Sequence, residues 1–155
     1  MADFIFNVAL GRAHEFARRV EDNDPANSAF LIIVIDAAGI SDATLKDVDT
    51  IADLEATGAN EVANSGYARK ELVDGDLTIT IDDSNDRVDI DFADQTWSAV
   101  VAGDTWTDLI VAYVYSEATG TSSDMIPISQ HDFAVTPDGS DITAQLNAAG
   151  FFRAS

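Results

Sequence analysis

Two uninterrupted apolar runs constrain the fold of this chain more than any other feature of its sequence. Residues 29–35 read AFLIIVI and residues 109–115 read LIVAYVY. Seven residues are far fewer than the ~20 needed to cross a bilayer as a helix. Both runs are rich in the β-branched and aromatic residues that favour strands. We therefore expect residues 29–35 to form a central strand buried on both faces, and residues 109–115 to form a second core strand.

A third segment shows a different pattern, in which apolar and acidic residues alternate. In residues 85–97, NDRVDIDFADQTW, the side chains of Val88, Ile90 and Phe92 alternate with those of Asp89 and Asp91. Successive side chains of a strand point to opposite faces. We expect a strand from Arg87 to Phe92 whose apolar face packs on a core and whose aspartates face outward and are solvated.

The remaining pattern predicts further strands, short turns and one or two helices. Helical spacing of apolar residues favours a helix near residues 9–20, although Gly11 weakens it and an alternating strand also fits. Ser41 is a suitable cap for a helix over about residues 42–56 that ends before Gly58. Further strands are expected at 66–72, 77–81 and 125–136, with Pro127 on a sheet edge, and residues 137–140, PDGS, are expected to form a hairpin turn.

The predicted fold is mainly β (α+β), a small β-sandwich or barrel with one or two flanking helices in a single domain of residues 1–155.

The charge balance restricts the partners that the chain can have. Its 28 acidic and 8 basic residues give a net charge of −20. Such a surface repels the phosphate backbone, so we expect no direct binding to nucleic acid. The short apolar runs and the acidic start of the chain predict neither a membrane span nor a secretory signal, and the absence of cysteine excludes a disulfide framework and thiolate metal sites.

Residues able to carry catalysis are few. Histidine is the side chain that most readily serves as an acid or base near neutrality, and the chain has two, His14 and His131. Ser129, His131 and Asp132 are the residue types of a hydrolytic triad, but Ser129 and His131 share one strand face and no nucleophile elbow accompanies them. Local bonding of His131 to Asp132 is the simpler interpretation, and we expect no enzyme, no cofactor and no catalytic or metal-binding residue.

One alternative within the residues is a carbohydrate-binding module assisted by Ca²⁺. Asp82, Ser84 and Asp86 match the first, third and fifth positions of an EF-hand loop. However, Arg87 occupies the sixth position, which requires glycine, and the twelfth position is not a glutamate. A looser calcium site among Asp82, Asp83 and Asp86 stays open, with Trp97 and Trp106 available to stack on sugars.

Both ends of the chain carry aromatic residues, which is unusual for terminal segments. Either these residues pack into the core of the domain itself, or they anchor a partner, since aromatic residues and arginine are enriched at interfaces. The cluster of Arg12, Arg18 and Arg19 could pair with a neighbouring subunit or with carboxylates of its own chain. The candidate assembly contacts are Phe4, Phe6, Arg12, Arg18, Arg19, Phe151, Phe152 and Arg153.

Nearly the whole chain resembles, in pattern, a family of small virion structural proteins of tailed bacteriophages. The resemblance is carried by FNVALGRAHEF, NDPANSAFLIIVI, ANEVANSGYARK, DDSNDRVDIDFADQTW, HDFAVTPDGSDITAQL and GFFRAS. It implies a capsid decoration (cement) protein that is made in the host cytoplasm. Such a protein binds the major capsid protein and copies of itself, as a homotrimer, on the outer surface of the virion head. A tail, baseplate or neck component is the alternative within the same class.

Overall fold

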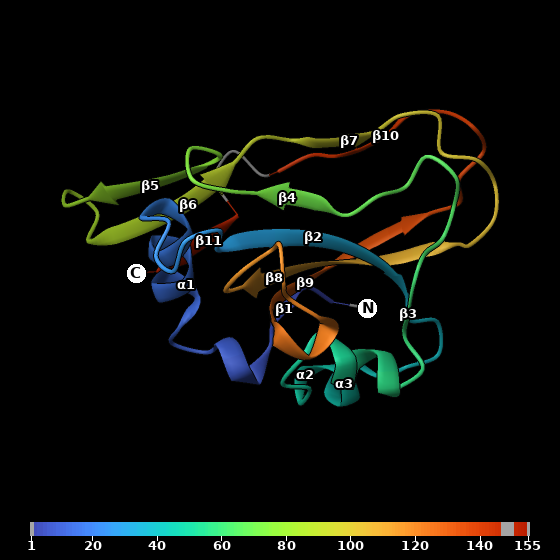
Figure 1. The fold of residues 1–155 in the computed structure, drawn as a ribbon, viewed down its shortest axis with the longest axis horizontal. Helices are drawn as coiled ribbons and strands as arrows, with labels where there is room; N and C mark the ends of the chain where they lie inside the picture. The colour runs from blue at the N-terminus through green and yellow to red at the C-terminus, as the bar shows by residue number, and fades with distance from the viewer. Residues whose placement is uncertain (1, 147–150, 155) are drawn as a thin grey trace.

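The two apolar runs form core strands, as predicted, and lie side by side at the centre of a sheet. In the computed structural model, which describes residues 2–146 and 151–154, they form β2 (Ala29–Asp36) and β8 (Trp106–Val114). The two strands pair antiparallel from Ala29 opposite Val114 to Ile35 opposite Asp108. Residues 29–35 of β2 are all buried, because a second sheet layer covers one face and helices cover the other (Figure 1).

The central sheet has the strand order β1-β9-β8-β2-β3, with β4 also paired to β2. Its other strands are β1 (Phe4–Ile5), β3 (Asn60–Glu61), β4 (Lys70–Leu72) and β9 (Met125–Val135). The short β1 pairs with Ser129 and Gln130 of β9, so β9 is not the edge strand of the sheet. Within the described residues, however, Pro127 lies where β9 is paired only to β8, which is the open outer side expected for this proline. The strand expected at 66–72 is reduced to β4.

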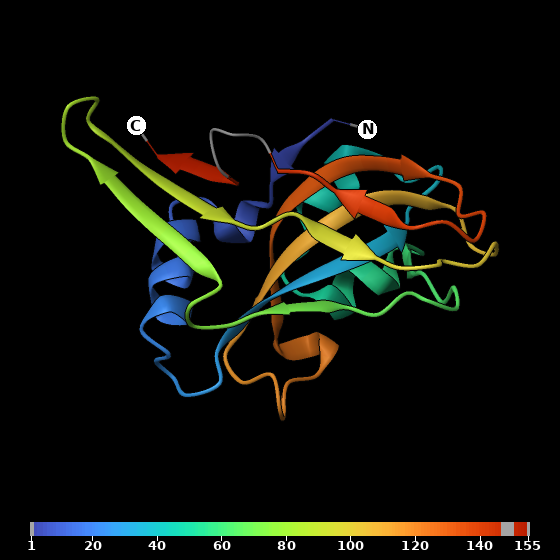
Figure 2. The same ribbon diagram turned by 90° about the horizontal axis from the view of Figure 1, so that it is seen from above.

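The second layer consists of two small sheets (Figures 1 and 2). One contains β5 (Leu77–Asp82), β6 (Arg87–Phe92) and β11 (Phe152–Ala154), and the other pairs β7 (Gln95–Trp97) with β10 (Ile142–Ala144). The hairpin of β5 and β6 extends beyond the rest of the molecule. The mainly-β, α+β class is confirmed, and the described strands stack as layers and do not close into a barrel.

The helices cover the ends and the outer face of the central sheet. Helix α1 (Ala13–Glu21) follows a 3-10 turn at Asn7–Ala9 and buries Phe16 against Tyr113, with the rings stacked at 4.6 Å. The helix predicted near residues 9–20 is therefore confirmed. It starts later than expected because Gly11, at φ +76°, lies between the 3-10 turn and α1. No helix in the described part of the chain is long and apolar enough to cross a membrane.

The single helix expected over residues 42–56 is instead two helices, α2 (Asp42–Lys46) and α3 (Ile51–Ala56). Ser41 caps α2, as predicted. The break occurs because Thr50 and Asp53 form a capping box, in which the Thr50 hydroxyl accepts the Asp53 N–H and the Asp53 carboxylate accepts the Thr50 N–H. A capping box starts a new helix, and the missed signal was the Thr50-x-x-Asp53 spacing.

The prediction of a hairpin at residues 137–140 is also wrong, although the chain does turn there. Gly139 adopts φ +99°, but the flanking strands β9 and β10 belong to different layers, and β10 pairs with β7. The turn therefore carries the chain from the central sheet to the second layer. Turn chemistry in the sequence specifies a local reversal and not the strand that follows it.

Candidate functional site

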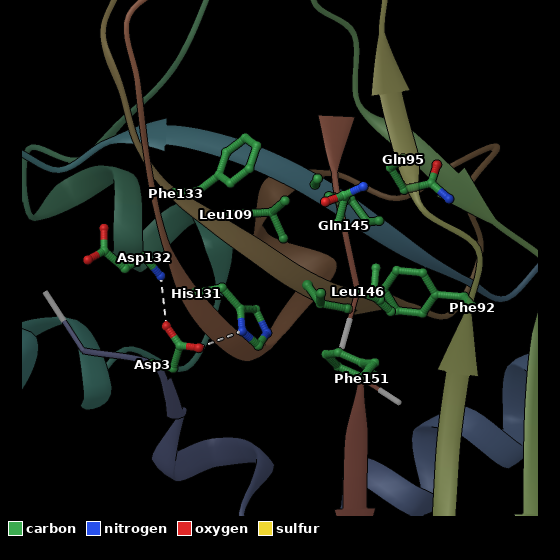
Figure 3. A pocket seen from close by; sticks show the side chains of 13 residues that line it. Asp3, Phe92, Gln95, Leu109, His131, Asp132, Phe133, Gln145, Leu146 and Phe151 are labelled. Carbon is green, nitrogen blue, oxygen red and sulfur yellow. Dashed lines mark hydrogen bonds and ion pairs between the residues drawn. The ribbon is translucent and has the colours of Figure 1, made fainter. Parts of the chain in front are cut away.

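A cavity of about 340 Å³ opens between the central sheet and the second layer (Figure 3). Its walls come from β2, β6, β7, β8, β9 and β10, from residues 145–146 after β10, and from the two chain ends. They consist of Asp3, Ile32, Phe92, Gln95, Leu109, Val111, His131, Asp132, Phe133, Ala144, Gln145, Leu146 and Phe151. This volume lies within the range of ligand pockets, ~300–1,000 Å³.

Phe151 is placed in the wall by a backbone contact. Its N–H donates to the carbonyl of Ile90 at 2.8 Å, at the point where β11 joins β6. The Phe151 ring then lies 5.2 Å from that of Phe92 and 5.9 Å from that of His131. The C-terminal aromatic residue therefore packs into its own domain, which is one of the two alternatives left open by the sequence.

His131 connects the N-terminal strand to the cavity wall. Its Nε2 lies 2.9 Å from Ser129 Oγ, and its Nδ1 lies 3.4 Å from Asp3 Oδ2. Asp3 Oδ1 also accepts the Asp132 N–H at 2.9 Å. The carboxylate facing the His131 ring nitrogen is thus that of Asp3, 128 residues away, and not that of the neighbouring Asp132 as expected.

This order of contacts matches the roles of a Ser-His-Asp triad, but the serine is inaccessible. Ser129 is 1% exposed and lies within β9. A substrate cannot approach the Ser129 hydroxyl, so the contacts orient the His131 ring as a wall of the cavity and hold β1 against β9.

The two tryptophans are buried. Trp97 and Trp106 are 1% and 0% exposed and pack edge to face at 5.3 Å. Trp97 Nε1 donates to the Ala68 carbonyl at 2.7 Å, and Trp106 Nε1 donates to Asn64 Oδ1 at 2.9 Å. Neither ring is available to stack on a sugar, which removes the residues on which the carbohydrate-binding alternative depended.

The suggested calcium loop is the turn of the projecting hairpin, and its first carboxylate already faces a cation. Arg87 Nε lies 3.1 Å from Asp82 Oδ2, and Asn85 donates to the same oxygen at 2.7 Å. Among residues 2–146 and 151–154, no group of three or more acidic or histidine side chains is arranged to hold a metal ion.

The arginine cluster of α1 pairs with its own helix. Arg19 contacts Glu15 at 2.8 Å, Arg18 contacts Glu21 at 2.7 Å, and Arg12 lies 3.8 Å from Glu15. The other basic side chains also have partners within the chain: Arg69 with Glu61, Arg87 with Asp82 and Asp89, Arg153 with Asp89, Lys46 over Phe4 and Lys70 over Trp97.

Asp89 is not the freely solvated carboxylate that the alternation predicted. Its side chain is 18% exposed and accepts from Arg153 Nε at 2.5 Å, with Arg87 at 3.2 Å. The hydrogen bond from Arg153 and the charges of both arginines lower the pKa of Asp89. The prediction failed because β11 pairs with β6 and sets Arg153 directly opposite Asp89, a contact that no local pattern reveals.

The remaining terminal candidates also contact their own chain. Phe6 is fully buried, and Phe4 lies edge to face against it at 5.1 Å. Phe152 is half-buried and packs against the core between the sheets. Gly150 and Ser155 of the GFFRAS motif lie outside the described residues. Phe6 therefore offers no side chain to a partner in this structure, whereas Phe4, Phe152 and the arginines keep exposed surface.

Most of the cavity could not be found from the sequence. Phe92 and Leu109 were predicted as core residues, but no sequence pattern indicated that one cavity would be lined by Asp3, Gln95, His131 and Leu146. In comparisons with known proteins, no family model, curated protein sequence or solved structure matches this chain.

Proposed function

We propose that this chain is a non-catalytic structural protein of a tailed-bacteriophage virion, which decorates the outer surface of the head. In this role it binds the major capsid protein at the seams between subunits and stabilises the shell. Copies at three-fold positions would associate as a homotrimer.

The observation that supports this proposal best is the internal pairing of the basic residues. Each of the eight basic side chains has an acidic or aromatic partner within the chain, while the net charge is −20. The surface offered to other molecules is therefore predominantly anionic. It would repel packaged DNA in the interior of a head, whereas the outer surface carries no such penalty.

The projecting hairpin is a suitable element for attachment. Among the described strands, β5 pairs only with β6, so its outer edge is open, and Ile81 on this strand is 69% exposed. An open edge can accept an extended segment of another protein as an additional strand. Acidic residues at both ends of β5, Asp76 and Asp82, would disfavour pairing of this edge with an equally acidic copy.

Heads purified from a phage that lacks the corresponding gene test the proposal. Purified protein added to these heads should sediment with them on the order of hundreds of copies per particle, at symmetry-related positions. It should also raise the temperature at which the heads release DNA, since a ligand of the assembled shell favours that shell. Binding confined to tails or necks would support the alternative component, and no binding to either would contradict both.

A further inference from the structure

The cavity described above is enclosed by large apolar side chains but is not filled by them. Phe92, Phe133, Phe151, Leu109 and Leu146 surround it, and they come from separate elements that the rest of the fold holds in place. Ala144, in contrast, contributes only a methyl group to the wall. The space is therefore available to an apolar group from outside the chain (Figure 3).

The polar side chains of the cavity select the charge of its occupant. Of the thirteen residues around it, Asp3 is the one whose carboxylate lies on the cavity side, beside the His131 ring, because the Asp132 carboxylate points to the opposite side of β9 (Figure 3). None of the thirteen is lysine or arginine. Aromatic faces attract cations, and the rings of Phe92, Phe133 and Phe151 add to the attraction of the Asp3 carboxylate. The site favours an apolar group that adjoins a positive charge.

An open strand edge next to the cavity indicates that the occupant is a peptide. β1 covers β9 only at Ser129 and Gln130. From Asp132 to Val135, β9 has no strand on its outer side in the described part of the chain, and the Asp132 N–H is met by the Asp3 carboxylate. An extended segment could continue along this edge beyond the end of β1, gaining backbone contacts while one side chain enters the cavity.

We propose that the cavity receives an apolar side chain from an extended basic segment of the partner protein, with a lysine or arginine beside Asp3. The segment lies along the outer edge of β9, and Phe133, Phe151 and Phe92 contact the inserted side chain. The assignment of the partner as the major capsid protein rests on the proposed function, whereas the chemistry of the cavity can be tested without it.

Short capped peptides provide the direct test. In amide NMR titrations of the whole protein, acetyl-Arg-Phe-Arg-amide should shift the signals of residues 131–133 and 144–146. It should bind at least about tenfold more tightly than acetyl-Arg-Ala-Arg-amide or acetyl-Glu-Phe-Glu-amide. Equal affinity for the three peptides, or shifts confined to another surface, would overturn the proposal. Phenethylamine binding as tightly as the first peptide would make the cavity a small-molecule site and would equally overturn it.

Matched variants separate filling of the cavity from general damage. Ala144→Leu places a larger side chain in the wall and should weaken binding of the first peptide by at least about tenfold. Ala56→Leu adds the same group at an exposed position of α3, away from β9, and should leave binding unchanged. If Ala144→Leu does not fold, Asp3→Asn, which keeps an oxygen to accept the Asp132 N–H, should weaken binding a few-fold, while Asp49→Asn, an exposed acid on the helical side, should not. Unchanged binding in the cavity variants would contradict the proposal.

The same variants distinguish this inference from the proposed function. If wild-type protein binds heads and a folded Ala144→Leu variant binds them equally well, the cavity is not the contact and decoration stands. If wild-type protein binds the first peptide selectively but does not bind heads, the cavity chemistry stands and the decoration role is wrong.

Discussion

Two neighbouring regions of one core are built in opposite ways. The tryptophan cluster, defined as Tyr67, Trp97 and Trp106 with Asn64, is sealed, whereas the cavity beside it is open. Phe133 borders both, since its ring lies 6.1 Å from that of Trp106 and also lines the cavity. Both regions lie between the central sheet and the second layer.

The tryptophan cluster is closed because each large ring has its polar group satisfied. The Trp106 N–H reaches Asn64, whose amide donates in turn to the carbonyls of Val101 and Asp104, each at 3.1 Å. Gly66 permits the close approach of residues 98–100, because a Cβ there would lie 2.8 Å from the Ala99 carbonyl oxygen. The cavity is bordered by rings of comparable size that are held apart. The core is thus closed where aromatic rings pack together and their polar groups have hydrogen-bond partners. It is open where the wall is assembled from separate elements.

Truncating the sealed region should have the largest effect on stability. Trp106→Ala removes a fully buried ring and leaves the Asn64 oxygen without its donor, and we expect a loss of about 3–5 kcal/mol in the free energy of unfolding. Urea denaturation followed by circular dichroism measures it. Val101→Ala, at a half-exposed position near the cluster, is the control and should change stability by less than about 0.5 kcal/mol. A loss below about 1 kcal/mol for Trp106→Ala would mean that the region is not sealed as described.

The next largest effect on stability is expected from a single hydroxyl in the sealed region. The Tyr67 hydroxyl accepts the Val34 N–H at 3.0 Å and donates to Glu61 Oε1 at 2.8 Å. Burial raises the pKa of Tyr67, so the hydroxyl stays protonated. Tyr67→Phe leaves a buried N–H without its acceptor, and we expect a loss of about 1–3 kcal/mol. Tyr115→Phe, at an exposed position, should be neutral in the same urea titration, and equal losses in both variants would refute this role of the hydroxyl.

Truncating an aromatic side chain at the cavity should lower the free energy of unfolding by less. Phe151 is half-buried, and its removal enlarges a space that already exists. We therefore expect Phe151→Ala to lower the free energy of unfolding by about 1–2 kcal/mol, clearly less than Trp106→Ala. The variant should also weaken binding of acetyl-Arg-Phe-Arg-amide, because one aromatic wall is lost. A stability loss equal to that of Trp106→Ala would show that the two regions do not differ.

The sequence predicted the centre of the molecule better than its cavity, for a physical reason. The run AFLIIVI can be buried on both faces only in a covered strand, so β2 followed from composition alone. The break between α2 and α3 depended on a capping signal that was overlooked, and the route from β9 to β10 depended on which strand lay nearby. Asp3 and His131 meet across 128 residues, and Arg153 and Asp89 across 64. Such contacts are set by the packing of the layers, which no local periodicity encodes.

The smallest expected effect concerns the attachment of β11, which follows the cavity residue Phe151. The pKa of Asp89 is lowered by Arg153, so the folded state holds a proton on this carboxylate less readily than the unfolded state. The stabilisation is therefore present above the unfolded pKa, ~4, and is lost as the pH falls through the lower folded value. The neutral hydrogen bonds of Trp97 and Trp106 have no such dependence.

Amide NMR signals of Phe152 and Arg153, followed from about pH 6 to pH 3, measure this difference, because they should move while those of Trp97 and Trp106 stay constant. Asp89→Asn should shift the Phe152 and Arg153 signals already at pH 6 and remove their titration. Asp91→Asn is the matched control on the same strand, since the Asp91 carboxylate accepts only the adjacent Phe92 N–H among the hydrogen bonds described for it, and it should leave both signals as in wild type. Identical behaviour of the two variants would show that Arg153 does not depend on Asp89, and the wall formed by Phe151 would then be held by packing and the Ile90 carbonyl alone.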